Sequence, residues 1–450
     1  MGCHLNCMNG NHDMSSEEML LAEVCRRTAM YSHCLVAYSG GLDSSVLLNL
    51  MTRISQQQHI SLRAVYIHHG LNPLADSWAE HCRQQCQRWQ VPFDVLHVDV
   101  DARQKGIEAA AREARYQALK NHLLPGEALL TAQHLDDQSE TFLLALKRGS
   151  GPAGLASMAE HSTSNGHVLL RPLLTFSRTQ LEAYAQTQQL SWIEDDSNGD
   201  ERFDRNFLRL HVLPLLKQRW PHFLSAVARS AALCAEQEQL LDELLAESLQ
   251  AMSDADGALC IDALMPLSPA RRFALLRRWI ARQGAQMPSR DQLQRVWQEV
   301  AMSKQDAEPQ LQLGNVQVRR FRQQLYLLPL MDSLKSCILP WQLAASSPLV
   351  LPDGLGCLML ASHGTHVRSP REGEQVTVRF MAQGKIHIVG RQHGRQMKKL
   401  WQEMGVPPWQ RERTPLLFYN EQLIAAVGVF ITMEGQVQHG EDGWHIDWQR

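Results

Sequence analysis

The sequence has no segment that would carry the protein to a membrane or out of the cell. No apolar run approaches the roughly 20 residues that a membrane helix needs. Residues 1–19 contain no basic stretch followed by an apolar one, so they do not form a secretory signal. The chain begins Met-Gly, but Asn6 stands where a myristoylation signal has serine or threonine. We therefore expect a cytoplasmic protein that has no membrane partner.

The sequence also lacks an excess of positive charge. Lys and Arg together number 44 against 47 Asp and Glu, which gives a formal net charge of −3. Bulk charge therefore provides no argument for nucleic-acid binding, and any such surface must be a local patch.

The ten cysteines form no C-x-x-C pair. Because there is no secretory signal, we expect them to stay reduced. Cys82 and Cys86 lie four residues apart in a helical stretch and are expected to pack in a core. Four residues of zinc-ligand type lie in the polar N-terminal segment, which we interpret as an irregular tail: Cys3, His4, Cys7 and His12.

From about residue 33 the sequence alternates between short apolar runs and helical segments. This order is typical of a doubly wound parallel α/β sheet, in which ligands bind at the carboxyl ends of the strands. The expected strands, with helices between them, are 34–38, 62–69, 93–100, 127–134 and 167–173.

After Trp220 the pattern changes. Residues 221–300 have helical periodicity, 310–330 alternate as in a hairpin, and 337–360 carry the prolines and glycines of a connector. The last segment mixes strands with one helix. The sequence therefore predicts a tail at 1–30, an α/β domain at 31–216, a mainly helical domain at 217–330, a connector at 331–369 and a small α+β domain at 370–450.

A glycine-rich loop directly follows the first expected strand. Paired glycines let the backbone approach an anion closely, and the first amides of the next helix point toward it. No lysine follows, which excludes the G-x-x-x-x-G-K-[ST] loop that cleaves the β–γ bond. Taken alone, the string is also compatible with a glycine turn and a helix cap. The residues assigned to nucleotide binding are Ser39, Gly40, Gly41, Leu42, Asp43 and Ser44.

Polar residues also end the fourth expected strand, in the string at 132–141. Side chains at that end of a strand face the same cleft as the glycine-rich loop. Asp137, together with Asp43, is a candidate ligand for Mg²⁺ across a triphosphate, and His134 is a candidate general base. The alternative is that Asp136 or Asp137 merely caps the next helix.

Arg112 and Arg115 lie three residues apart, on one face of an expected helix. Such a pair suits the recognition of phosphate or carboxylate. Solvated salt bridges to Glu108 and Glu113 are the competing interpretation.

Two local basic patches occur in the second half of the chain. Residues 376–413 hold eight Lys or Arg against two Glu, a formal charge of +6, with Trp401, Trp409 and His393 between them. Four arginines lie in the second patch, at 271–278. Phosphate contacts with aromatic stacking are the functional interpretation, and a solvated basic helix is the alternative.

These strings resemble known families. The 39–44 loop is similar to the SGGxDS loop of the ATP pyrophosphatase (PP-loop) superfamily, which implies an adenine nucleotide α-hydrolase-like fold and an adenylated intermediate. The glycine-rich turn at 149–155 and the polar string at 194–209 resemble those of the lysidine synthases. That resemblance spans about residues 33–216, and 390–428 is similar to the last domain of the same family.

The resemblance implies ATP as co-substrate, together with Mg²⁺. The C2 oxygen of the wobble cytidine in a CAU-anticodon isoleucine tRNA would attack the α-phosphate, and L-lysine would then displace AMP. The domains at 217–330 and 370–450 would contact the tRNA, and a homodimer is left open. The implied catalytic residues are Asp43, His134, Asp137, Arg112 and Arg205, of which the two arginines would steady charge on the intermediate.

Three alternatives stay open from the residues. One is another PP-loop enzyme of tRNA modification such as a thiolase, which the absence of C-x-x-C disfavours. The second is a small-molecule ATP-dependent ligase, which would not need the basic C-terminal domain. The third is a binding protein whose loop is inactive.

Overall fold

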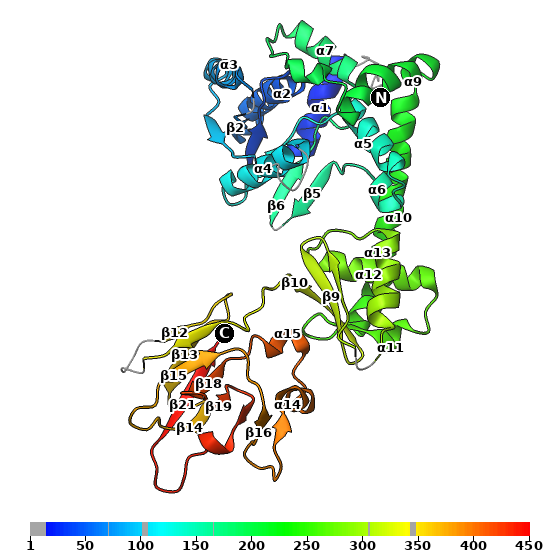
Figure 1. Ribbon diagram of the computed structural model, residues 1–450. Coiled ribbons are helices and arrows are strands. Elements are labelled where there is room, and N and C mark those ends of the chain that lie inside the picture. Colours follow the sequence, from blue (N-terminus) through cyan, green and yellow to red (C-terminus); the bar gives the residue numbers. More distant parts are fainter. Residues whose placement is uncertain (1–14, 71, 101–106, 165, 305–306, 343–347) are drawn as a thin grey trace, which may run out of the picture. The chain divides into compact units, whose positions relative to one another are not determined.

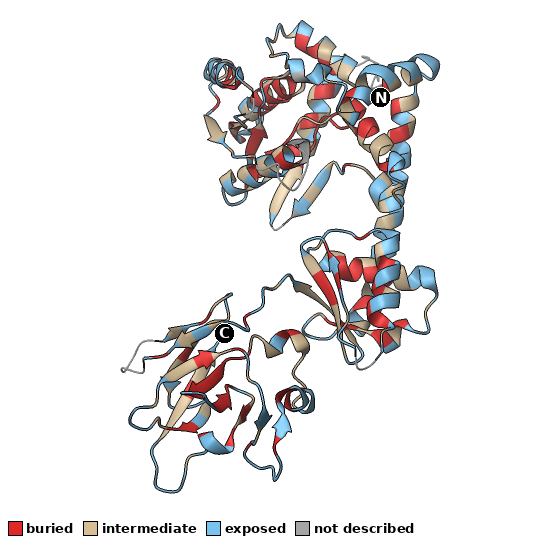
Figure 2. Ribbon diagram, in the orientation of Figure 1, coloured by how far each residue is buried: buried red, intermediate tan, exposed pale blue. Residues whose placement is uncertain are grey.

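The computed structural model describes residues 15–70, 72–100, 107–164, 166–304, 307–342 and 348–450 (Figure 1). Its contacts divide the chain into two compact units, Met1–Leu241 and Asp242–Arg450. In each unit the buried residues lie on the strands and on one side of the helices (Figure 2). The N-terminal residues of zinc-ligand type lie outside the described residues. Across the described part, no helix combines the length and the apolar character needed to cross a membrane.

The first unit is built on a six-stranded sheet in the order β3-β2-β1-β4-β6-β5. Its strands are β1 (His33–Ala37), β2 (Ser61–His68), β3 (Phe93–His97), β4 (Ala128–Leu130), β5 (His161–Ser164) and β6 (His167–Leu170). Every neighbouring pair except β6–β5 is parallel, which confirms the predicted parallel sheet. The antiparallel edge strand β5 was not predicted, because it is short and polar.

Helices cover both faces of this sheet. The helices of this part of the chain are α1 (Ser16–Thr28), α2 (Leu42–Gln58), α3 (Ala75–Arg88), α4 (Ile107–His122), α5 (Leu135–Lys147), α6 (Pro152–Leu155), α7 (Arg178–Thr187), η1 (Asp196–Gly199), α8 (Asp204–Phe207), the π-helical η2 (Leu208–Val212), α9 (Leu213–Arg219) and α10 (Phe223–Met252), which contains the boundary between the units. α1, α2, α3 and α7 share one core with the sheet, where Cys82 and Cys86 are fully buried as expected. On the other face Leu119 of α4 packs against Leu35 and Leu129. The doubly wound class is confirmed.

The predicted irregular tail at 1–30 is wrong for its second half, where α1 is a regular helix. Its first turn is closed by a capping box between Ser15 and Glu18. Leu20 and Val24, four residues apart, are buried in the core of the first unit. The guanidinium of Arg27, in the last turn of the helix, donates a hydrogen bond to the backbone carbonyl of Pro172. This helix was not predicted from the sequence, because its apolar face is narrow and most of its residues are polar.

The first part of the second unit packs helices against a four-stranded sheet in the order β7-β10-β9-β8. Its elements are β7 (Leu259–Cys260), α11 (Ile261–Leu264), α12 (Pro269–Arg282), α13 (Arg290–Arg295), the π-helical η3 (Val296–Ala301), β8 (Gln310–Leu313), β9 (Val316–Phe321) and β10 (Gln324–Pro329). Leu275 and Ile280 of α12 pack with Val318 and Leu325 of the sheet. The helical pattern was predicted, but the expected hairpin at 310–330 is three strands of this sheet.

The remainder of the second unit holds two larger sheets, β11-β15-β18-β19-β20 and β12-β13-β21-β14. Its elements are β11 (Ile338–Pro340), β12 (Leu349–Val350), β13 (Cys357–Ala361), β14 (Thr365–Arg368), β15 (Val376–Arg379), β16 (Lys385–Ile386), β17 (Arg395–Gln396), α14 (Met397–Glu403), α15 (Pro408–Arg411), β18 (Leu416–Tyr419), β19 (Gln422–Ala426), β20 (Phe430–Ile431), η4 (Met433–Gly435) and β21 (Gly443–Gln449). The predicted connector at 331–369 is wrong. Leu358 of β13 and Val367 of β14 share a core with Val378, Leu417 and Ile446, so this segment belongs to the last domain. The partner strand β21 is distant in sequence, which is why local pattern did not reveal the pairing.

Candidate active site

The glycine-rich loop lies between β1 and α2, as the sequence predicts. Gly40 has φ of +80°, and Gly41 is the N-cap residue of α2. The Ser44 hydroxyl donates to the Gly41 carbonyl at 3.0 Å and lies 3.0 Å from the Ser39 hydroxyl. The backbone amides at the start of α2, among them those of Leu42 and Asp43, are thus held at a helix N-terminus, where an anion is favoured.

Gly40 is required by what surrounds it. A Cβ atom at this position would lie 2.5 Å from Ile193 Cδ1 and 2.8 Å from Cys82 Sγ. The Ile193 amide donates to the Gly40 carbonyl at 2.9 Å. The adjoining Ser191 hydroxyl accepts from Gln85 of α3 at 3.0 Å. The segment at 191–193 therefore fixes the loop. No local sequence pattern marks this segment, because its contact with the loop is made only in the folded chain.

The second predicted string meets the loop through His134. The Nε2 atom of His134 lies 3.5 Å from Asp43 Oδ2 and 3.4 Å from Asp137 Oδ2, and its Nδ1 lies 3.7 Å from Asp136 Oδ2. The imidazole is almost completely buried. The capping interpretation holds in part, because Asp137 also accepts the His134 amide at 3.1 Å and closes the N-terminus of α5. One imidazole is thus surrounded by three carboxylates.

These neighbours set the protonation of the cluster. Burial by itself lowers the pKa of His134, but Asp137, Asp43 and Asp136 more than offset it and raise the pKa to about 8. For Asp43, burial acts to raise the pKa, and the contacts with His134, Arg178 and Arg209 outweigh it, so its pKa is lowered. The three carboxylates therefore favour the protonated, positively charged form of the ring. The role of His134 as a general base stays a prediction.

Cations that the sequence analysis did not assign complete the site. Arg178, at the start of α7, donates to Asp43 Oδ2 at 2.9 Å. Arg209, on η2, lies 3.2 Å from Asp137 Oδ1 and 2.8 Å from the fully buried Glu140. Lys217 of α9 lies 3.0 Å from Asp136. Arg209 ends the 194–209 string that resembles the lysidine synthases. Arg178 and Lys217 lie outside the predicted motifs, because their contacts join elements distant in sequence.

The two arginines predicted to be catalytic lie in different places. Arg205 donates to the Thr141 hydroxyl at 3.3 Å and lies 3.8 Å from Glu140, so it borders the carboxylate cluster. Arg112 lies on α4, with its guanidinium 5.3 Å from the ring centroid of Tyr116. Within the described residues, Arg112 makes no contact with the cluster around His134. The structure therefore brings four of the five predicted catalytic residues together and leaves Arg112 apart: Asp43, His134, Asp137 and Arg205.

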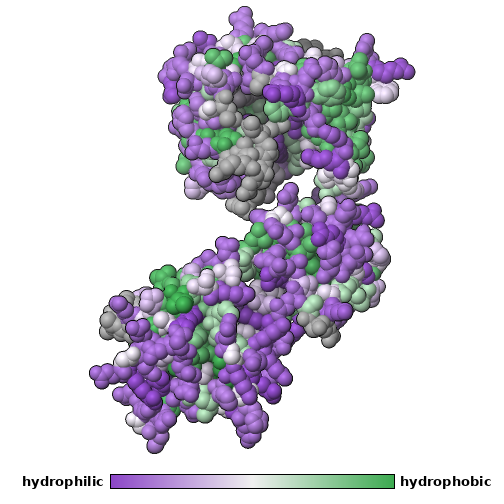
Figure 3. Space-filling view, viewed as in Figure 1, coloured by the Kyte–Doolittle hydropathy of each residue, from purple (hydrophilic) through white to green (hydrophobic). Residues whose placement is uncertain are grey.

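The aromatic residues expected to stack on bases are core residues. Trp401 is 5% exposed and packs against Phe430. Trp409 is 8% exposed, and its ring centroid lies 4.8 Å from that of Tyr326. The stacking interpretation is therefore wrong for both tryptophans, although the face of the second unit seen in Figure 3 is largely hydrophilic.

Much of the expected basic charge is also neutralised within the second unit. The paired arginines of the 376–413 patch and their partners are Arg379 with Glu421, Arg391 with Glu403, Arg411 with Glu308 and Arg413 with Asp353. In the 271–278 patch, the buried Arg278 pairs with Asp242. Arg272 donates to the carbonyls of Met265 and Leu267 and covers the ring of Trp297. These residues are chiefly structural.

Comparisons with known proteins agree with this geometry. Family models match at residues 14–216 (PP-loop domain), 259–326 (TilS substrate binding domain) and 376–448 (TilS substrate C-terminal domain). The chain is 69% identical over 434 residues to the tRNA(Ile)-lysidine synthase of Pectobacterium atrosepticum, covering 96% of this chain and 98% of that protein. It is 61% identical to the enzyme of the same name from Serratia proteamaculans, covering 97% and 100%, and 59% identical to that of Edwardsiella ictaluri, covering 95% and 97%.

Proposed function

This chain belongs to the tRNA(Ile)-lysidine synthase family, and we propose that it joins L-lysine to C2 of the wobble cytidine in the CAU-anticodon isoleucine tRNA. The reaction consumes ATP and releases pyrophosphate and AMP. The cytidine C2 oxygen attacks the α-phosphate, pyrophosphate leaves, the ε-amine of lysine then attacks C2, and AMP leaves. Adenylation is needed because it turns a poor leaving oxygen into a good one.

The observation that carries the proposal is the junction of the two motifs. Asp43 of the glycine-rich loop and Asp137 of the second string approach the same nitrogen of His134. Phosphate-binding amides and a carboxylate cluster therefore share one edge of the sheet, as the adenylation of a substrate and its attack by an amine require. The alternatives of a thiolase and of a small-molecule ligase are not favoured, because relatives of one name cover nearly the whole chain.

The carboxylates also fit Mg²⁺, which we propose as the metal cofactor. The Oδ1 atom of Asp43 is buried and has no hydrogen-bond partner, so one oxygen is left available for a cation. The described residues contain no group of three or more side chains able to hold a metal by themselves. Mg²⁺ commonly binds to one or two carboxylates together with phosphate oxygens and water, so Asp43 and Asp137 suffice. When bound, it would neutralise negative charge on the triphosphate.

The remaining side chains have positioning roles in this proposal. The loop amides, with Ser39 and Ser44, hold the pyrophosphate, and the charge of His134 keeps Asp43 and Asp137 in place. The carboxylate of Asp137 also suits the orientation of a lysine amine. Arg205, which is half-buried beside Glu140, is placed to steady negative charge on the adenylated intermediate.

The test is to incubate the protein with ATP, Mg²⁺, labelled L-lysine and the CAU-anticodon isoleucine tRNA, and to count label in precipitated RNA. We expect label that requires ATP and the wobble cytidine and that is lost in Asp43→Ala. Asp76→Ala is the matched control, since Asp76 is an exposed carboxylate that contacts His68 outside the cluster. Release of pyrophosphate without label in RNA would retain the adenylation chemistry and contradict the lysidine assignment.

A further inference from the structure

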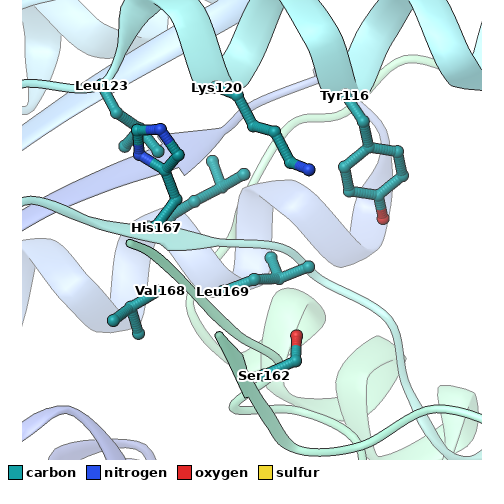
Figure 4. Close-up of a pocket in the computed structure, with 8 residues that line it drawn as sticks. Tyr116, Lys120, Leu123, Ser162, His167, Val168 and Leu169 are labelled. Atoms are coloured by element: carbon teal, nitrogen blue, oxygen red, sulfur yellow. The ribbon is translucent and has the colours of Figure 1, made fainter. Parts of the chain in front are cut away.

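A small cavity lies on the α4 side of the first unit's sheet, apart from the carboxylate cluster. It has a volume of about 140 Å³ and lies between α4 and the β5–β6 hairpin. Tyr116 and Lys120 reach toward it from α4, and His167 and Ser162 lie on the strands beneath (Figure 4). Its floor is apolar, formed in part by Leu169. Hydrogen-bond donors thus surround an apolar base.

The polar residues of α4 on this side form a stripe. Arg112, Tyr116 and Lys120 recur every four residues, so they lie on one face of the helix and follow each other at steps of about 6 Å. The stripe runs from the end of α4 near the carboxyl edge of the sheet toward the opposite edge, where β6 begins with His167. An extended polyanion, with its charges repeated along a chain, matches such a stripe better than a single small anion does.

The cations of this stripe have no acidic partners in the part of the chain that the structure describes. Neither Arg112 nor Lys120 forms an ion pair there, in contrast to Arg379 and Arg413 of the second unit. Unpaired cations retain their full attraction for phosphate, whereas a paired arginine must first give up a carboxylate.

Arg171 supports the stripe from beneath. It follows β6, is 8% exposed, and its Nε has no hydrogen-bond partner. Its guanidinium donates to the Ala159 carbonyl at 2.6 Å. Burial lowers the pKa of Arg171, and nearby Arg112 lowers it further. A buried cation without a carboxylate adds positive potential beneath the stripe.

We propose that the stripe of Arg112, Tyr116 and Lys120, with His167 across the cavity, binds backbone phosphates of the RNA substrate. The surface begins near the edge of the sheet that holds the ATP site, so a strand whose base is modified there can continue along α4. The proposal rests on the proposed function for its choice of RNA. Contacts of this kind position the substrate and do not read its sequence.

Equilibrium binding of tRNA, measured without turnover, tests the proposal. Lys120→Gln keeps most of the side-chain stem and removes the charge, Lys120→Glu reverses it, and Lys120→Arg restores it. We expect the Kd for tRNA to rise roughly three- to tenfold in the first variant, more in the second, and little in the third. The slope of log Kd against log salt should fall by about 0.7–0.9 in Lys120→Gln, and equally for tRNAs of other sequence, because one phosphate contact is lost.

Arg88→Gln is the matched control, because Arg88 is an exposed cation at the end of α3, on the opposite face of the sheet. Unchanged Kd and salt slope in all three Lys120 variants, with unchanged thermal unfolding, would overturn the proposal. A higher KM for ATP or lysine at an unchanged Kd for tRNA would overturn it in favour of a small-anion site. Since binding is measured without lysine, failure of the ligation assay and failure of this proposal are separate results.

Discussion

The imidazole Nε2 of His134 lies 3.5 Å from a carboxylate oxygen of Asp43, and this contact joins the two polar motifs of the first unit. Asp43 lies in the first turn of α2 and His134 directly precedes α5. Strands β1 and β4 place them together because these strands are neighbours. The same nitrogen lies 3.4 Å from Asp137. A protonated ring thus compensates two carboxylates that would otherwise repel each other at short range.

The first prediction concerns His134, which lies between the carboxylates of Asp43 and Asp137. His134→Ala should lower the rate of pyrophosphate release by about 10²-fold or more, because both carboxylates lose the cation between them and with it their positions. His134→Gln keeps one N–H donor and should recover part of the loss. His97→Gln, at the exposed end of β3, is the control and should be near wild type. Equal rates for the alanine variant and the wild type would show that the contact of His134 with the two carboxylates is not needed for pyrophosphate release.

The second prediction compares two adjacent glycines. Gly40→Ala places Cβ 2.5 Å from Ile193 Cδ1 at a φ of +80°, so about 1–3 kcal/mol of stability should be lost along with ATP binding. At Gly41 the nearest atom to an added Cβ is Ser39 Oγ at 3.6 Å, which is an ordinary contact. Gly41→Ala should therefore change the free energy of unfolding by less than about 0.5 kcal/mol. Thermal and urea unfolding of both variants would measure the difference, and equal losses would contradict the steric argument.

The contrast between these two positions shows what the sequence can and cannot reveal. The loop, the strand–helix alternation and the string around His134 are local patterns, so short stretches of the sequence are enough to predict them. The contact between Gly40 and Ile193 depends on the tertiary fold, as does the pairing of β13 with β21. The prediction of a strongly basic surface in the second unit was inaccurate for a related reason. The composition counts each arginine, but it does not show which carboxylate pairs with that arginine after folding, as Asp353 does with Arg413.

The third prediction concerns Glu140, whose carboxylate is fully buried and pairs with Arg209 at 2.8 Å. Glu140→Ala should cost about 3–5 kcal/mol, because it leaves Arg209 partly buried without its main partner. Glu182→Ala removes the partly exposed partner of Arg178 and should cost less than about 1 kcal/mol. Urea unfolding of the two variants checks the comparison. A cost for Glu140→Ala no larger than that for Glu182→Ala would contradict the assignment.

The fourth prediction concerns pH. Burial, together with Arg115 and His68 nearby, lowers the pKa of His69 from 6.5 to about 4. The unfolded chain therefore binds a proton at a higher pH than the folded chain does. This contribution to stability is fully present above pH 6.5 and is lost as the pH falls toward 4, with an upper limit of about 3 kcal/mol. In His69→Gln the unfolding free energy should depend less on pH across this window. An unchanged dependence would show that His69 titrates normally in the folded protein.

The fifth prediction tests whether Trp409 of the second unit stabilises the fold or contacts RNA. Trp409 is 8% exposed, lies 4.8 Å from the ring of Tyr326 and 6.1 Å from that of Phe321, and so joins α15 to β9 and β10. Trp409→Ala should lower stability by about 3–5 kcal/mol, the cost of deleting a buried aromatic. Trp409→Phe should restore most of it, and its Kd for tRNA should match that of the wild type. If the indole instead stacked on a base, the phenylalanine variant would retain stability but bind tRNA more weakly, since stacking is worth about 1–3 kcal/mol per base.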